Sequence, residues 1–238
     1  MASIADNLLT VCQRIGAACV AAGRAPSSVR LLAVSKTYGA QEVLAAHSAG
    51  QCAFGENYIQ EGIEKITALS PQVFTPPLFP ALDWHCIGPI QSNKTKGVAQ
   101  HFDWVQSLDR LKIAQRLNEQ RPPHLPPLQV CIQVNVDGGA NKSGVEPQHA
   151  LELALALQEL PALKLRGLMC IPEPADFAQT LEVMGQAKVL FDQLNAYSHN
   201  GKSLGLDTLS MGMTADLEAA IQAGSTMVRV GTAIFGKR

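Results

Sequence analysis

Short apolar runs alternate along the chain with longer stretches in which apolar residues recur every three or four positions. This alternation predicts buried strands separated by amphipathic helices. Eight strands are predicted, over residues 30–35, 52–55, 83–88, 103–107, 128–136, 163–171, 206–211 and 226–231. Helices are predicted between them, near residues 40–49, 57–69, 92–100, 109–120, 147–158, 176–196 and 214–223.

A further amphipathic helix is predicted over residues 3–22, where Gly23 ends the pattern and Pro26 blocks its continuation. Eight strands with helices between them favour a parallel sheet closed into a barrel. We therefore predict an α/β fold, a single (β/α)₈ TIM-type barrel with an extra N-terminal helix. The alternative is a doubly wound open sheet, which usually uses fewer strands for this length. No break in composition marks a second domain, so residues 1–238 are expected to form one domain.

The amino-acid composition excludes some classes of binding partner. The chain has 238 residues, of which 47% are hydrophobic, and a formal net charge of −1. Because there is no basic surplus, neither nucleic acid nor an anionic membrane is an expected partner. The sequence shows no signal peptide and no apolar stretch long enough to span a bilayer. The six cysteines form no CxxC pair and lie in apolar segments, which favours a reducing, cytoplasmic location.

The segment LLAVSKTYGA, residues 31–40, places a lysine at the end of the first predicted strand. Active sites of barrels of this kind lie at these carboxyl ends. Leu32, Val34 and Lys36 share one face of the strand, so the lysine is expected at the top of the barrel over an apolar floor. Burial there would lower its pKa and favour the neutral amine that a Schiff base to an aldehyde requires. A lysine that caps the strand and reaches water is an equal alternative.

Two turns after the last two predicted strands have the composition of phosphate sites. LSMGMTADLEAA (209–220) and VRVGTAIFG (228–236) each run from a strand through a turn into a helix, with Ser210 and Gly212 in the first turn and Gly231 and Thr232 in the second. Strands seven and eight commonly supply the phosphate site of a barrel. Glycine allows close approach there, and amide and hydroxyl groups donate to the anion. Ordinary strand–helix turns use the same residues. A phosphate site opposite Lys36 suggests pyridoxal 5'-phosphate (PLP).

Arg229 has the same strand parity as Gly231 and is therefore expected to point into the barrel. A guanidinium in an apolar interior needs a partner. One candidate is the pyridine nitrogen of PLP. The other is an acidic neighbour such as Glu56.

Seven segments spread over nearly the whole chain carry a resemblance to a known family. They are AVSKT (33–37), FGENYIQE (54–61), WHCIGPIQSNK (84–94), NKSG (141–144), RGLMCIP (166–172), LSMGMTADLEAAI (209–221) and GSTMVRVGTAIFG (224–236). In order and spacing the chain resembles the pyridoxal phosphate homeostasis proteins, which are related to the barrel domain of alanine racemase. The resemblance implies a single barrel that binds PLP through Lys36.

Matching motifs assign further roles by resemblance. They imply that Asn57 lies beside the cofactor and that Arg229 faces the ring nitrogen. They also imply that the phosphate is held by a set comprising Ser210, the Met211 backbone, Gly231 and Thr232. One departure concerns Tyr38-Gly39, which stand where the family often has Lys-Pro. In the family, the lysine of this Lys-Pro pair is a candidate accessory site for the cofactor. Its replacement here puts a role of this position in cofactor transfer in doubt, but it does not affect the Schiff base on Lys36.

Three functions are compatible with these features. The first, which we expect, is a non-catalytic carrier that buffers or delivers PLP to PLP-dependent apo-enzymes, as a monomer or weak dimer. The second is a PLP-dependent amino-acid racemase or a related fold-type III enzyme. Racemisation needs a base on each face of the substrate. In alanine racemase the second base is a tyrosine of another subunit, supported by a β-domain that we expect to be absent because the chain ends seven residues after Gly231. The third is a sugar-phosphate enzyme with Lys36 as an aldolase-type amine.

Other motifs are weak. GGANKSG (138–144) resembles a phosphate loop, but Asn141 stands where the GxxxxGK[ST] pattern needs glycine. The six histidines have no HxH or HxxxH spacing, so no metal site is expected. The proline-rich segments 71–80 and 121–127 are expected to be loops on the N-terminal side of the barrel.

Overall fold

Eight parallel strands close into a barrel in the computed structural model of the protein, which describes residues 2–70, 80–139, 143–173, 175–199 and 202–236. The order around the ring is β1-β2-β3-β4-β5-β6-β9-β10, and β10 pairs with β1. The predicted fold class is therefore confirmed. The strands are β1 (Arg30–Val34), β2 (Ala53–Glu56), β3 (Asp83–Cys86), β4 (Trp104–Leu108), β5 (Leu128–Gln133), β6 (Leu163–Met169), β9 (Thr208–Ser210) and β10 (Met227–Val230).

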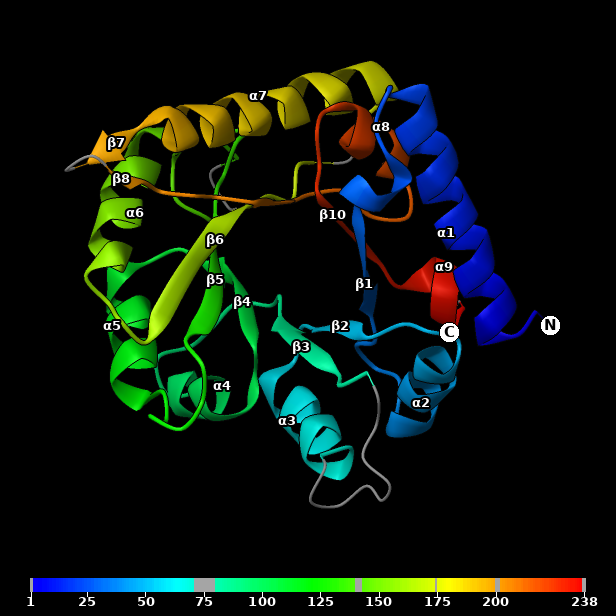
Figure 1. Ribbon diagram of the computed structural model, residues 1–238, viewed down its shortest axis with the longest axis horizontal. Coiled ribbons are helices and arrows are strands. Elements are labelled where there is room, and N and C mark those ends of the chain that lie inside the picture. The colour runs from blue at the N-terminus through cyan, green and yellow to red at the C-terminus, as the bar shows by residue number, and fades with distance from the viewer. Residues whose placement is uncertain (1, 71–79, 140–142, 174, 200–201, 237–238) are drawn as a thin grey trace.

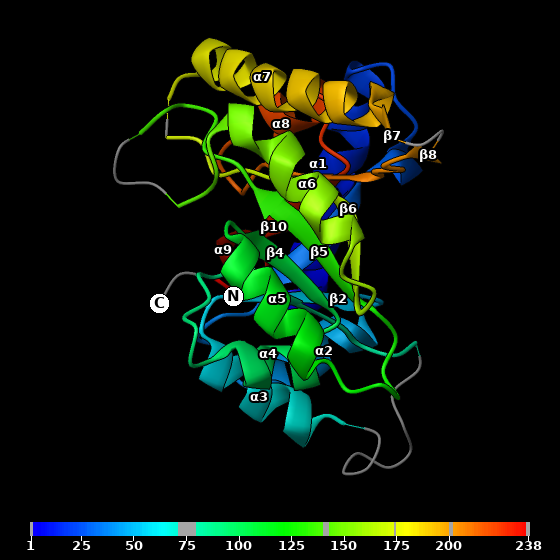
Figure 2. The same ribbon diagram turned by 90° about the vertical axis from the view of Figure 1, so that its left-hand side faces the viewer.

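Helices surround the barrel, as Figure 1 shows, and Figure 2 shows the same arrangement from a second side. They are α1 (Ile4–Ala21), α2 (Ala40–Ser48), α3 (Ile59–Ala68), α4 (Thr95–His101), α5 (Leu111–Gln120), α6 (Ala150–Gln158), α7 (Phe177–Ala196), α8 (Leu217–Gln222) and α9 (Thr232–Phe235). Two 3-10 turns, Pro26–Ser28 and Pro147–His149, precede β1 and α6.

The extra N-terminal helix α1 packs against the last two helices of the barrel. It begins at a capping box in which Ser3 and Asp6 satisfy each other's backbone N–H groups. The side chain of Asn7 donates a 2.8 Å hydrogen bond to the backbone carbonyl of Ile234 in α9, and Arg14 pairs with Glu218 in α8 at 2.9 Å. Thus α1 braces the helices that follow β9 and β10.

The structure adds short elements that the sequence pattern did not predict. The strands β7 (Ser198–His199) and β8 (Lys202–Ser203) form a small antiparallel ribbon after α7. Like the four-residue α9, they are too short to produce a periodic pattern. Residues 121–127 connect α5 to β5 on the N-terminal side of the barrel, as predicted. Residues 71–79 and 140–142, which include Asn141, lie outside the described residues.

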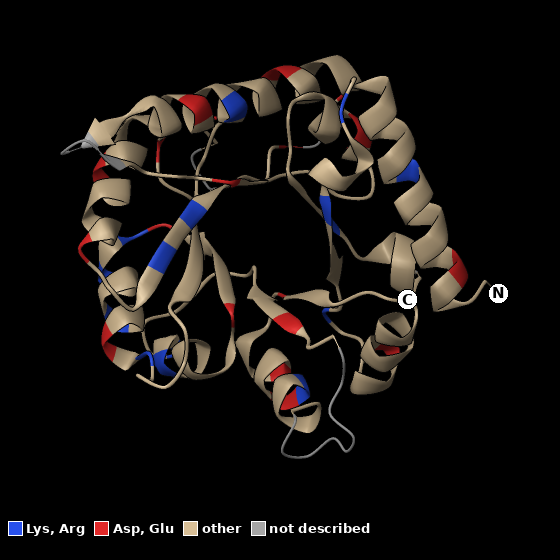
Figure 3. Ribbon diagram, in the orientation of Figure 1, with Lys and Arg blue, Asp and Glu red and all other residues tan. Residues whose placement is uncertain are grey.

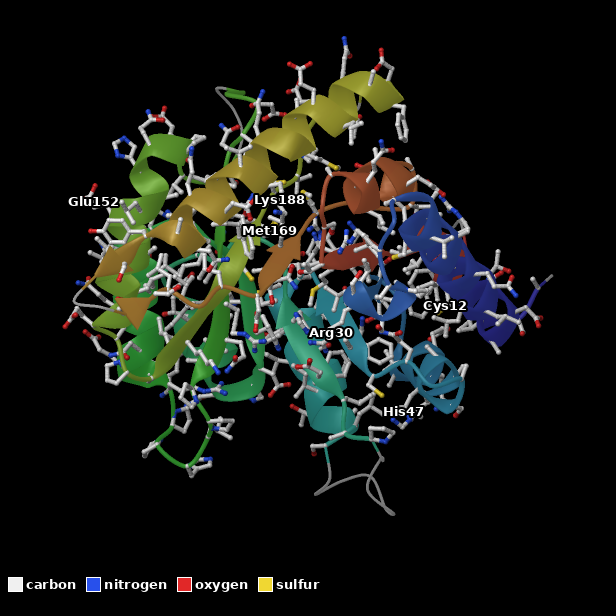
Figure 4. All side chains as sticks on the ribbon, turned by 45° about the horizontal axis from the view of Figure 1, so that its top comes forward. Cys12, Arg30, His47, Glu152, Met169 and Lys188 are labelled. Carbon is white, nitrogen blue, oxygen red and sulfur yellow. The ribbon has the colours of Figure 1, made fainter. Side chains whose placement is uncertain are left out.

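The apolar core has two parts. The larger part lies between the strands and the surrounding helices. Inside the barrel lie two smaller clusters, one containing Trp104, Cys131 and Met169 and the other containing Leu32, Val34, Ala53, Ile87 and Met227; Met169 is labelled in Figure 4. Charged residues of both signs are interspersed over the outer helices (Figure 3). In the described ranges, none of the helices combines the length and apolar character needed to cross a bilayer.

A partly buried carboxyl group just before β4 affects stability. Asp103 accepts a 2.9 Å hydrogen bond from the backbone N–H of Trp84. Burial nevertheless raises the pKa of Asp103 to about 6. Between about pH 4 and pH 6 the unfolded chain loses this proton before the folded chain does. The contribution of Asp103 to the free energy of unfolding therefore falls as the pH rises through this window.

We predict that Asp103→Asn stabilises the protein in a pH-dependent way. Asparagine keeps an oxygen acceptor for Trp84 but never carries the buried charge. The variant should gain about 1–2 kcal/mol of unfolding free energy at pH 7, and this gain should shrink as the pH approaches 4. Urea unfolding of both proteins at several pH values measures the difference. A difference that stays constant with pH would contradict the prediction.

Candidate functional site

A cavity of about 750 Å³ opens at the carboxyl ends of the strands. Its lining combines residues that follow β1, β2, β3, β6, β9 and β10. This volume is typical of small-molecule sites. Five of the lining residues carry the chemistry considered below: Lys36, Asn57, Thr214, Arg229 and Thr232.

Lys36 lies just after β1 and lines the cavity, as the strand alternation predicts. The apolar floor is also present, because Val34 and Ile87 line the cavity and belong to an interior cluster. The side chain of Lys36 is nevertheless exposed. The expectation that burial prepares this amine was therefore wrong. The amine is accessible to a ligand and to water.

Asn57 follows β2 directly and contributes an amide to the cavity wall. Its side-chain oxygen is buried and has no hydrogen-bond partner among the described residues. Gly88 packs tightly against it, since a Cβ at that position would lie 2.1 Å from the Asn57 carbonyl oxygen. The backbone position of Asn57 therefore depends on glycine at residue 88. A buried oxygen without a partner fits a site that a polar ligand completes.

Arg229 points into the barrel, as its strand parity predicted. It is 4% exposed and lines the cavity. Its Nη1 donates to the Ser210 hydroxyl at 2.8 Å, and its Nη2 donates to the Cys170 carbonyl at 2.9 Å. The alternative partner considered from the sequence, Glu56, pairs instead with Lys65 at 2.8 Å.

The bond from Arg229 to Ser210 starts a chain of hydrogen bonds through the barrel interior. The Ser210 hydroxyl donates to Gln106 Oε1 at 2.6 Å, and Gln106 Nε2 lies 2.9 Å from His85 Nδ1. His85 Nε2 lies 3.3 Å from Asp83 Oδ2. Asp83 also accepts a 2.9 Å bond from Arg30, which is labelled in Figure 4. Arg30 begins β1, so this series of hydrogen bonds reaches the end of the barrel opposite the cavity.

The protonation state of His85 fixes the direction of this chain. Complete burial lowers the pKa of His85 from its usual value, so its imidazole is neutral at pH 7. The network then assigns Nδ1 as the acceptor from Gln106 and Nε2–H as the donor to Asp83. Burial alone would raise the pKa of Asp83, but the hydrogen bond from His85 and the Arg30 guanidinium hold it below its ordinary value. Each group thus donates toward the Asp83 carboxylate.

The other wall of the cavity follows β9 and β10. Gly231 and Thr232 line it, as expected from the sequence. Ser210 and Met211 are fully buried and are not among the lining residues. The hydroxyl of Ser210 is used by Arg229 and Gln106, and the backbone N–H of Met211 donates to the Met227 carbonyl at 3.1 Å. Both groups thus have partners within the protein, and the phosphate contacts expected of Ser210 and the Met211 backbone stay predictions.

The residue that sequence reasoning missed in this turn is Thr214, which lines the cavity beside Met213. The sequence does contain a signal for it, a second hydroxyl four residues after Ser210 in the same strand–helix turn. Gln106 was also missed. Its signal is a polar residue inside the otherwise apolar run of β4.

Tyr38, at the position where the family often has lysine, joins two walls of the cavity. Its hydroxyl donates to the Gly236 carbonyl at 2.8 Å. Its ring stacks on Phe235 with centroids 5.0 Å apart. Tyr38 therefore links the segment that carries Lys36 to the helix that follows Gly231. Within the described residues, no cluster of three or more His, Cys, Asp or Glu side chains is arranged to hold a metal ion.

Comparison with known proteins identifies the family of the chain. The family model for the N-terminal domain of alanine racemase matches residues 17–238. A pyridoxal phosphate homeostasis protein of Pseudomonas aeruginosa is 54% identical over 239 residues, which cover 100% of this chain and 97% of that protein.

Solved structures extend the comparison. The structure of PipY from Synechococcus elongatus with PLP bound is 33% identical, with a TM-score of 0.81, over 98% of this chain and 100% of PipY. Alanine racemase from Corynebacterium glutamicum is 16% identical, with a TM-score of 0.63, over 96% of this chain and 61% of the racemase. This second likeness shows the fold alone. The chain belongs to the pyridoxal phosphate homeostasis protein family, within the wider group that shares the N-terminal domain of alanine racemase.

Proposed function

We propose that this protein is a carrier that binds PLP as a Schiff base on Lys36 and buffers it or delivers it to PLP-dependent apo-enzymes, with the whole chain as one binding domain. The observation that carries the proposal is that Lys36, Arg229 and Thr232 line one cavity of suitable size. The PLP-bound structure of the homologue PipY supports the choice of ligand.

The residues of the cavity fit PLP in kind and number. When bound, PLP supplies an aldehyde that condenses with a primary amine, and the exposed Lys36 provides this amine. The two bonds that Arg229 makes to Ser210 and Cys170 use two of its five N–H donors. A donor therefore remains for an acceptor such as a ring nitrogen. The Asn57 side-chain oxygen, which lacks a partner among the described residues, can accept from a ligand hydroxyl.

In this proposal the phosphate lies at the wall formed by Gly231, Thr232 and Thr214. The threonine hydroxyls are donors, and so are the first-turn N–H groups of Thr232 and Ala233, whereas those of Ile234 and Phe235 already donate to the Gly231 carbonyl. Ser210 has an indirect role, because it holds the Arg229 guanidinium. The expected phosphate contacts of Ser210 and Met211 are thereby replaced by a contact from Thr214.

The composition of the cavity favours a carrier over a racemase. Among the described residues that line it there is no histidine and no carboxylate. The Tyr38 hydroxyl is engaged with the Gly236 carbonyl. A guanidinium facing the ring nitrogen also keeps that nitrogen unprotonated, which weakens the cofactor as an electron sink. Proton transfer on both faces of an amino acid therefore lacks a second base in this lining.

Lys36 is predicted to be the attachment point. Borohydride reduction of the PLP-loaded protein, followed by peptide mapping, should find the pyridoxyl group on the peptide that contains residues 31–40. Lys36→Ala should lose the yellow absorption band and the adduct, because no other lysine lines the described part of the cavity. A full-strength band in that variant, with the adduct on another lysine, would disprove the assignment.

The proposed phosphate position, beside Gly231, Thr232 and Thr214, predicts that removing two different hydroxyl groups has different effects on ligand affinity. Thr232→Ala should weaken PLP binding roughly tenfold, because one hydrogen bond to a charged group contributes about 1.5–3 kcal/mol. It should leave unphosphorylated pyridoxal unaffected. Ser210→Ala should weaken both ligands to a similar degree, because it loosens Arg229. Titration with the two ligands measures this contrast. Equal losses for both ligands in Thr232→Ala would place the phosphate elsewhere.

The carrier proposal predicts binding without turnover. PLP-loaded protein is incubated with L-alanine in heavy water, while chiral chromatography follows the enantiomers and mass spectrometry follows α-deuterium. We expect slow deuterium exchange at most and no sustained formation of D-alanine, because the lining offers no second base. Continued racemisation, decarboxylation or transamination that disappears in Lys36→Ala would instead establish an enzyme.

A further inference from the structure

The two residues on either side of Lys36 are both held by one group of charged side chains, of which Glu56 and Lys65 are buried and Glu61 is half-buried. The Ser35 carbonyl accepts a 2.7 Å bond from Lys65 Nζ, and the Ser35 hydroxyl donates to Glu56 Oε1 at 2.6 Å. On the other side, the backbone N–H of Thr37 donates to Glu61 Oε1 at 2.5 Å. We name Glu56, Glu61 and Lys65 the Lys65 cluster.

The Lys65 cluster has little freedom to rearrange. Besides Ser35, Lys65 Nζ donates to Glu56 Oε1 at 2.8 Å and to Glu61 Oε1 at 2.7 Å. These three bonds use all three N–H groups of the ammonium. Lys65 is 5% exposed and Glu56 is fully buried. Charge-assisted bonds in such a setting fix their partners more firmly than neutral ones.

The conformation of Thr37 shows why this hold matters. Its φ angle is +69°, and it is the one non-glycine residue with a positive φ in the described part of the chain. The left-handed region is strained for a β-branched residue. Such strain persists when surrounding contacts determine the conformation. The contact from the Thr37 N–H to the Glu61 carboxylate is of this kind, and Lys65 holds that carboxylate in place.

We propose that Glu61 and Lys65 are positioning residues that hold Thr37 in its left-handed conformation and so present Lys36 to the cavity. The inference rests on the proposed function, in which Lys36 is the attachment point. If Thr37 relaxed to an ordinary φ, the chain after Lys36 would turn in another direction. Tyr38 would then leave Phe235 and Gly236, and the lysine would lose its orientation toward the wall at Gly231.

The experiment compares PLP binding to Glu61→Gln and to Glu64→Gln. Glutamine at position 61 removes the charge that holds the Thr37 N–H and places an amide beside the Lys65 ammonium. We expect the PLP dissociation constant of Glu61→Gln to rise about tenfold, equivalent to about 1.4 kcal/mol. Glu64 is an exposed residue of the same helix, and Glu64→Gln should bind as the native protein does.

A second substitution separates positioning from a general effect on folding. Asparagine adopts the left-handed region more easily than threonine. The double variant Glu61→Gln/Thr37→Asn should therefore recover most of the lost affinity. Unchanged binding in Glu61→Gln, or a loss that Thr37→Asn does not restore, would overturn the inference. Adduct mapping of the same samples keeps the two proposals apart, since a pyridoxyl group on a residue other than Lys36 would contradict the proposed function instead.

Should Glu61→Gln fail to fold, single substitutions at Thr37 test the strain directly. Thr37→Asn should unfold at a higher temperature than Thr37→Val, because valine keeps the β-branch and asparagine does not. Equal unfolding temperatures would show that the left-handed conformation is not strained and would overturn the inference.

Discussion

The buried guanidinium of Arg229 is the constraint around which the barrel interior is organised. A charge at 4% exposure must be compensated or it destabilises the fold. Its two hydrogen-bond partners among the described residues are the Ser210 hydroxyl and the Cys170 carbonyl, and neither is a carboxylate. Aligned dipoles that end on Asp83 help to compensate this charge, and the negative charge of Asp216 favours it as well. A cation at one end of the barrel is thus joined to an anion near the other end.

This chain of hydrogen bonds requires polar residues at matched heights on different strands. His85 and Gln106 lie on the neighbouring strands β3 and β4, whereas Ser210 lies on β9 and reaches Gln106 across the barrel interior. The stacking of His85 on Trp104, with centroids 4.9 Å apart, restricts the imidazole further. Partly satisfied polar networks are costly inside proteins. Substitution of any residue in this network should therefore alter the position of the Arg229 guanidinium, and hence the lining of the cavity.

The sequence was sufficient for the barrel, for the cavity-facing Lys36 and for the inward direction of Arg229, because alternation along a strand determines which face a side chain takes. The sequence did not reveal that the Ser210 hydroxyl bonds Arg229 and Gln106 in the barrel interior, and its predicted phosphate contact stays a prediction. Gln106 and the Lys65 cluster act through contacts between residues distant in the sequence. The bond from Lys65 to the Ser35 carbonyl, for example, depends on where α3 lies relative to the segment that follows β1, which no local pattern encodes.

An exposed Lys36 suits a carrier better than a buried one would. Release of a Schiff base needs water at the imine carbon, whereas catalytic sites commonly exclude water to protect reactive intermediates. Because the Lys36 amine is accessible to water, desolvation does not make it more reactive toward an aldehyde. Its reactivity must therefore come from its orientation. The backbone around Lys36 meets that need, since Ser35 and Thr37 are held by the Lys65 cluster and Tyr38 is held by Phe235 and Gly236. In the proposed carrier, a rigid backbone thus supports a side chain that stays open to exchange.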